Sequence, residues 1–297
     1  MKPEPGVMKA TLLIATRLLA LTVVYFVCFA GVSAALIPSL PEQPAQAGAA
    51  IVPLLAVSLL NTLVLSYVIL RSHWSGWKLV LAIFFVLYGV TTVMPQIETA
   101  FFVTRLPPGM LPRLFLSGAV IGALVSTLAV LILGKGRSNE RVSNRYRLDM
   151  HVSEWVGKLS LIVIVYLIIY FSFGYFIAWK SAAVRAYYGG SDPGSFLAQM
   201  STVLRGTPML LPLQAARALL WTIIAVPVIR MMKGQRWETG LAVSLLFAVV
   251  MCSQLLLPNP LMPQEVRMVH LLETATSNFL FGWVIVLVLN WRRAVPQ

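Results

Sequence analysis

The feature that most constrains this chain is a series of eight apolar runs, each long enough to cross a lipid bilayer as a helix. A transmembrane α-helix needs about 20 consecutive, predominantly apolar residues. Charged residues make up 11% of the chain, against roughly a quarter in soluble domains, and the mean hydropathy is +0.83. The sequence therefore predicts an all-α integral membrane protein, a polytopic bundle of about eight transmembrane helices. The expected spans are approximately 18–37, 49–70, 79–94, 114–133, 159–179, 210–229, 241–257 and 269–289.

The distribution of Lys and Arg predicts the orientation of the chain. With the N-terminus on the inner side, about fifteen basic residues fall in inner segments and about six in outer ones, a positive-inside bias. We therefore expect a multi-pass protein of the inner or plasma membrane of the cell, with both termini in the cytoplasm. The net charge of +13 then reflects loops that face anionic lipids on the cytoplasmic side, not nucleic-acid binding. An alternative for the first run is a cleaved signal peptide, although the run is long for one.

The order of spans and loops in the first part of the chain recurs in the second. Each part has a short basic hairpin with a tryptophan, Trp77 or Trp237, and the tripeptide Met-Pro-Gln occurs at 94–96 and again at 262–264. This pattern favours two parallel four-helix repeats, but any eight-span chain can also be divided into similar halves. The expected domains are a first four-helix half, 1–135, a basic cytoplasmic linker, 136–158, and a second four-helix half, 159–297.

The second half also contains an outer segment, 191–206, with the pattern of an amphipathic helix. Ser191-Asp192-Pro193 is a typical helix start, and the apolar residues that follow share one face. We expect this helix to lie on the outer membrane interface, with a loop helix packed on the bundle as the alternative.

Polar residues that lipid would not tolerate singly mark a candidate site. At 100° per residue, one side of the last span carries Arg267, His270, Glu273 and Asn278. Arg217 and Glu98 lie at a similar expected depth, and we predict that Arg217 pairs with Glu98 or Glu273 in the wall of an outward-facing cavity. The alternative is a structural ion pair that holds helices in register. The candidate ligand-binding residues are Arg217, Glu98, His270, Glu273, Asn278 and Arg267.

The sequence gives no signal for a cofactor or a metal. Its three histidines lie far apart, its two cysteines, Cys28 and Cys252, lie inside apolar runs, and the common hydrolase and nucleotide-binding motifs are missing.

Three kinds of function remain. The first is a transporter or membrane-embedded binding protein for a small polar or amphiphilic ligand. The second is an intramembrane enzyme that acts on a lipid-linked substrate at the outer leaflet. In that case His270 or Glu273 would be the general acid or base, and Arg217 or Arg267 would hold the head group. The third is a structural subunit of a membrane complex. The sequence favours the first and leaves the substrate, catalytic residues and oligomeric state open.

Overall fold

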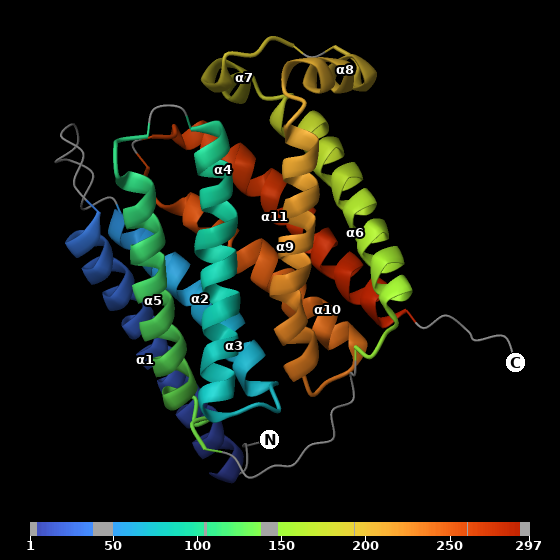
Figure 1. Ribbon diagram of the computed structural model, residues 1–297. Coiled ribbons are helices and arrows are strands. Elements are labelled where there is room, and N and C mark those ends of the chain that lie inside the picture. The colour runs from blue at the N-terminus through green and yellow to red at the C-terminus, as the bar shows by residue number, and fades with distance from the viewer. Residues whose placement is uncertain are drawn as a thin grey trace, which may run out of the picture. The chain divides into compact units, whose positions relative to one another are not determined.

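The computed structural model describes residues 5–37, 50–103, 106–137, 148–192, 194–259 and 261–291. Apart from an isolated bridge between Ser72 and Met232, all regular structure in these ranges is helical. The described ranges contain eight helices that are long and apolar enough to cross a membrane. The predicted all-α polytopic bundle is thus confirmed (Figure 1). The spans are Met8–Leu36, Ile51–Leu70, Gly76–Phe102, Met110–Ile132, Val152–Ala178, Leu210–Met231, Arg236–Leu256 and Gln264–Asn290.

The helices form two compact units. Unit 1 comprises Met1–Ser143 and the short segment Met231–Lys233, which includes Met232, the bridge partner of Ser72. Within it the first helix packs against the second and the last, and the third also packs against the last. A buried hydrogen bond of 2.9 Å from Asn61 Nδ2 to Tyr25 Oη joins the first two helices. The elements of unit 1 are α1 (Pro5–Leu36), α2 (Ile51–Leu70), α3 (Gly76–Tyr88), the π-helical turn η3 (Gly89–Val93), α4 (Met94–Phe102) and α5 (Met110–Ile132).

Unit 2 comprises Asn144–Arg230 and Gly234–Gln297. Its elements are α6 (Val152–Phe173), the π-helical turn η4 (Gly174–Ala178), α7 (Ala182–Tyr188), α8 (Phe196–Gly206), α9 (Leu210–Met231), α10 (Arg236–Leu245), the π-helical turn η5 (Leu246–Val250), the 3₁₀ helix η6 (Cys252–Leu256) and α11 (Gln264–Asn290). The last helix, α11, contacts α6, α7, α10, η4, η5 and η6. Its polar residues therefore lie among protein groups on several sides.

A glycine on α11 allows a close backbone contact with α10. A Cβ atom on Gly282 would lie 2.6 Å from the Cα of Ser244 on α10, well inside the contact distance of about 3.5–4.0 Å. The two helices can touch at this level only because residue 282 has no side chain.

The segment 191–206, expected to lie on the outer interface, differs from the expectation in where its helix begins. Ser195 caps α8, its Oγ accepting the backbone N–H of Ala198 at 3.2 Å. The predicted start at Ser191 and Asp192 is wrong, because Asp192 Oδ1 accepts the N–H of Gly194 at 2.9 Å in a tight turn. Gly194 has a φ of 65°, a left-handed conformation that ends any helix there. The unpredicted short helix α7 precedes this turn.

Candidate functional site

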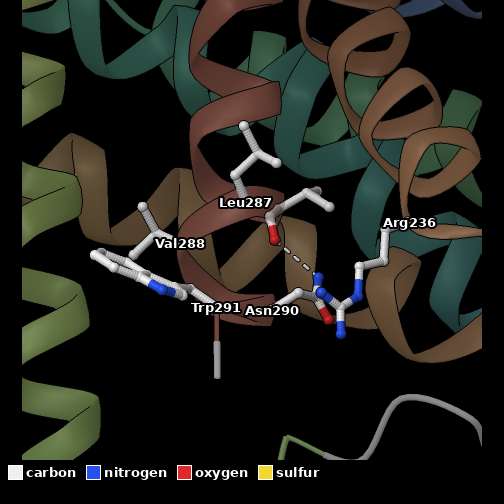
Figure 2. A pocket seen from close by; sticks show the side chains of 6 residues that line it. Arg236, Leu287, Val288, Asn290 and Trp291 are labelled. Carbon is white, nitrogen blue, oxygen red and sulfur yellow. Dashed lines mark hydrogen bonds between the residues drawn. The ribbon is translucent and has the colours of Figure 1, made fainter. Parts of the chain in front are cut away.

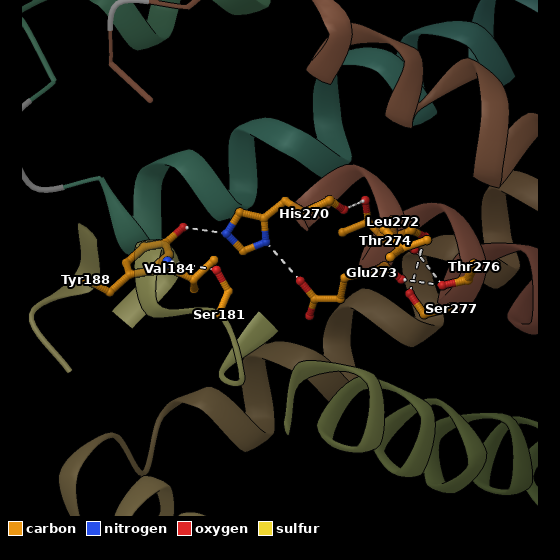
Figure 3. Close-up of polar contacts among 9 residues, drawn as sticks. All are labelled: Ser181, Val184, Tyr188, His270, Leu272, Glu273, Thr274, Thr276 and Ser277. Atoms are coloured by element: carbon orange, nitrogen blue, oxygen red, sulfur yellow. Dashed lines mark hydrogen bonds and ion pairs between the residues drawn. The ribbon is translucent and has the colours of Figure 1, made fainter. Parts of the chain in front are cut away.

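The site begins with a chain of hydrogen bonds between α11 and α7 (Figure 3). His270 Nδ1 lies 2.8 Å from Glu273 Oε2, and its Nε2 lies 3.3 Å from the hydroxyl of Tyr188. The first contact follows from the helix, because residues three apart share a face. The side chains of His270 and Glu273 are 19% and 12% exposed, so other protein groups cover most of the surface of both. Both ring nitrogens of the histidine therefore have a defined partner.

A π-helical turn passes beside the carboxylate of this chain. Gly174 is the first residue of η4, and a Cβ built on it would lie 3.6 Å from Glu273 Oε1. Such a turn widens the helix by one residue per turn and is frequent at functional sites. The glycine leaves the space next to Glu273 free of a side chain.

Asn278 lies farther along α11 and is 7% exposed. Its Nδ2 is 3.1 Å from Met251 Sδ and 3.8 Å from Cys252 Sγ, on the residues that directly follow η5. Thioether and thiol sulfurs are weak acceptors, so these contacts offset little of the cost of burying an amide. The polar face of α11 thus meets η4 at Glu273 and the end of η5 at Asn278.

Arg217 lies on α9 within a second polar cluster. It is 3% exposed, so it does not face lipid, and its Nη1 donates to Gln214 Oε1 at 2.9 Å. The same oxygen accepts the hydroxyl of Tyr166 on α6 at 3.2 Å. The ring of Tyr166 in turn lies 4.6 Å from that of Phe281, which places this cluster beside α11. The pairing of Arg217 with Glu98 or Glu273 stays a prediction.

The remaining two candidates are Arg267 and Glu98. Arg267 Nη1 donates to the carbonyls of Leu255, at 3.2 Å, and of Leu257, and so caps the end of η6. These bonds give the guanidinium a role in the fold. Glu98 lies on α4 in unit 1, whereas the other five candidates belong to unit 2.

A pocket opens at the opposite end of α11 (Figure 2). Asn290, whose Nδ2 donates to the carbonyl of Val286 at 2.8 Å, lies about 30 Å along the helix from His270 at a rise of 1.5 Å per residue. This pocket is therefore separate from the candidate site. Its lining residues are Arg236, Val286, Leu287, Val288, Asn290 and Trp291.

Two residues of the site, Tyr188 and Gln214, were missed by the sequence analysis. Within the described ranges, no three His, Cys, Asp or Glu residues gather as a metal site would require. Comparison with known proteins found no match to this chain among protein families, curated proteins or solved structures.

Proposed function

We propose that this chain is a transporter or membrane-embedded binding protein for a small polar or amphiphilic ligand. The observation that carries the proposal is the polar face of α11, which meets two π-helical segments of one unit at Glu273 and Asn278. Polar side chains can also join membrane helices by hydrogen bonds, but the hydrogen-bond partners of Asn278 Nδ2 are two sulfur atoms, which are weak acceptors and account poorly for a buried amide. Polar groups inside membrane spans are costly, and they commonly mark the path of a substrate or ion.

The geometry of His270 suggests how a ligand could enter. Its contact with Tyr188 is 3.3 Å long, whereas its contact with Glu273 is 2.8 Å. A long hydrogen bond is the weaker of the two, so a ligand hydroxyl, amine or carboxylate could replace the tyrosine at little cost. Glu273 would keep the imidazole oriented during the exchange.

The proposal includes an orientation of the chain in the membrane. The excess of Lys and Arg in the segments assigned to the inner side favours cytoplasmic termini in a cell membrane. With that orientation, the His270 end of α11 opens toward the outer side, and the basic loops contact anionic lipids of the cytoplasmic leaflet.

The second candidate function is an enzyme acting on a lipid-linked substrate at the outer leaflet. The His270–Glu273 contact favours it, because a carboxylate on Nδ1 orients the imidazole so that Nε2 can act as a general base. Transport and catalysis would use the same residues and differ in whether the ligand is altered.

The experiment uses the purified full chain in lipid nanodiscs. Amino acids, carboxylates, sugars, amines and phosphate esters are screened for compounds that raise the melting temperature. Each active compound is then tested on Glu273→Gln, with Glu154→Gln as the matched control. Glu154 is also a carboxylate paired along a helix, lying 2.8 Å from Lys158 Nζ, but on α6. We expect a compound that stabilises the wild type and Glu154→Gln but not Glu273→Gln.

The same compound then separates the two functions. Protein-dependent uptake of the intact compound into proteoliposomes supports transport, whereas its chemical conversion supports the enzyme. If every active compound stabilises Glu273→Gln as strongly as the wild type, the proposed site is wrong.

A further inference from the structure

The two units repeat one another in a constant register. Trp77 and Trp237 are 160 residues apart, and so are the first residues of α3 and α10, Gly76 and Arg236. Ser72 and Met232, paired in the bridge of unit 1, show the same separation. The Met-Pro-Gln tripeptides are 168 residues apart and do not belong to this register.

The buried positions follow the same register. Of the ten buried residues of α2, nine have a buried residue 160 positions later in α9, and the exception is Ser66. The close contacts follow it too: Gly122 faces Phe84 in unit 1, and Gly282 faces Ser244 in unit 2. These nine counterparts in α9 are Gln214, Arg217, Ala218, Trp221, Thr222, Ile224, Ala225, Val228 and Ile229.

The first helices of the two units correspond with a shorter separation. Tyr25 and Tyr166 are 141 residues apart, and each bonds to an amide on the next long helix of its own unit. Arg17 and Lys158 are also 141 apart, and each donates to a carbonyl near the end of its unit's last helix, of Leu133 and Leu289. The difference between the two separations reflects the insertion of α7 and α8 in unit 2.

The repeat allows the residue types at equivalent positions of the two units to be compared. At buried positions where unit 1 has Leu54 and Val57, unit 2 has Gln214 and Arg217. Where unit 1 has Gly118, unit 2 has Asn278. Because unit 1 builds the same arrangement with apolar or small residues, packing does not explain these polar groups in unit 2.

The orientation of Gln214 is determined by its neighbour. A guanidinium can only donate hydrogen bonds, so the atom of Gln214 that faces Arg217 must be the amide oxygen, Oε1. The amide nitrogen therefore points elsewhere. Gln214 is fully buried, and its Nε2 has no hydrogen-bond acceptor among the described residues.

A second donor lies on the same face of α9. Trp221 is fully buried, and its indole Nε1 also has no acceptor among the described parts of the chain. Seven residues correspond to about two turns, so the two residues lie on one side of the helix with their backbone positions about 10 Å apart along its axis. A buried donor without an acceptor is costly, and two on one face call for an explanation.

We infer that this face of α9 in unit 2 binds an elongated anionic ligand through the donors Gln214 Nε2 and Trp221 Nε1. A carboxylate or phosphate oxygen accepts from Gln214 Nε2, and a second acceptor about two helical turns away accepts from Trp221 Nε1. Charged acceptors make the stronger hydrogen bonds, which favours an anion. The inference deepens the proposed function and rests on it, because it names the chemistry of the ligand.

The test replaces the donor Nε2 of Gln214 by an acceptor oxygen. Gln214→Glu keeps an oxygen that accepts from Arg217 and Tyr166 but replaces the donor Nε2 by an acceptor. The new carboxylate can also pair with Arg217, so the ligand-free variant should stay folded, and its own melting temperature is the reference for its binding. Gln235→Glu, the same change on an exposed loop residue, is the matched control. Trp221→Phe removes the second donor and keeps a ring against Phe247, whose centroid lies 4.2 Å away in the wild type.

The probes are suberate and hexane-1,6-diyl bisphosphate, which carry acceptor oxygens at both ends, and hexyltrimethylammonium as the cation. Each is added to the full chain in nanodiscs while the melting temperature is followed. We expect at least one anion to stabilise the wild type and Gln235→Glu, and to bind Gln214→Glu and Trp221→Phe about tenfold more weakly or worse. Stabilisation by suberate alone identifies the acceptors as carboxylates, and stabilisation by hexane-1,6-diyl bisphosphate alone identifies them as phosphates.

Two results would overturn the inference: no anion stabilises the wild type, or the anions stabilise both α9 variants as strongly as the wild type. A different result distinguishes the failure of this inference from the failure of the proposed function. If hexyltrimethylammonium stabilises the wild type but not Glu273→Gln, the binding function stands and the anionic ligand is wrong.

Discussion

Replacing Gly282 by alanine should destabilise unit 2 at the contact between α10 and α11. The added Cβ would lie 2.6 Å from Ser244 Cα and 2.8 Å from Ser244 N, so the helices must separate by about 1 Å to restore normal contact. Overpacking typically costs about 1–3 kcal/mol, and backbone atoms cannot yield by changing rotamer, which favours the upper end. The gain in helix propensity from Gly to Ala offsets at most about 1 kcal/mol. The net expectation is a loss of about 2 kcal/mol.

Gly122 on α5 supplies the control for this variant. It precedes Gly282 by 160 residues, but a Cβ there would lie 3.3 Å from a ring carbon of Phe84, a side chain that can shift. We therefore expect Gly122→Ala to stay within about 1 kcal/mol of the wild type. Gly31, with no atom within 4 Å of its would-be Cβ, is a second control.

Thermal unfolding in nanodiscs measures the three variants under one condition. Gly282→Ala should melt about 4 °C or more below the wild type, and the two control variants should melt close to it. Equal melting temperatures for Gly282→Ala and Gly122→Ala would refute the reasoning, because α10 and α11 would then not approach as closely as described.

Three further predictions concern other parts of the chain. Burial, with a smaller contribution from nearby lysine charges, lowers the pKa of His73, so protonation favours the unfolded chain. The melting temperature should therefore fall as the pH drops below about 6.5, the usual pKa of histidine, and fall less in His73→Gln when compared at pH 7.5 and 5.5. Ser195→Ala should speed hydrogen exchange at the start of α8, since a lost N-cap costs about 1 kcal/mol, whereas Ser191→Ala should not. Arg267→Gln should speed exchange in η6, because charged hydrogen bonds to its last carbonyls contribute about 1.5–3 kcal/mol.

The spans could be predicted from the sequence because lipid imposes a simple rule on them. Backbone groups inside the bilayer must bond within the helix, so long apolar runs leave few alternatives to a helix. The ends of the helices were less predictable. For example, α6 begins at Val152 and α11 at Gln264, several residues before the apolar runs at 159 and 269, because their first turns are polar. The π-helical turns have no hydropathy signal at all.

The candidate site was predictable where it depends on one helix. His270 and Glu273 share a face at a spacing of three residues, and the structure brings them into contact. Tyr188 belongs to a helix of seven residues, too short to give a periodic pattern. Gln214 is a single amide near the start of an apolar run, so only its burial and its bond to Arg217 distinguish it.

The position of a bound compound tests the account most directly. A cryo-EM map of the full chain in nanodiscs, with the most strongly stabilising compound of the screen, would locate it against the side chains. The account predicts density within hydrogen-bonding distance of the polar groups of unit 2, at Gln214 or along the Glu273–Asn278 face of α11. Density confined to the pocket between Arg236 and Trp291, at the other end of that helix, would contradict it.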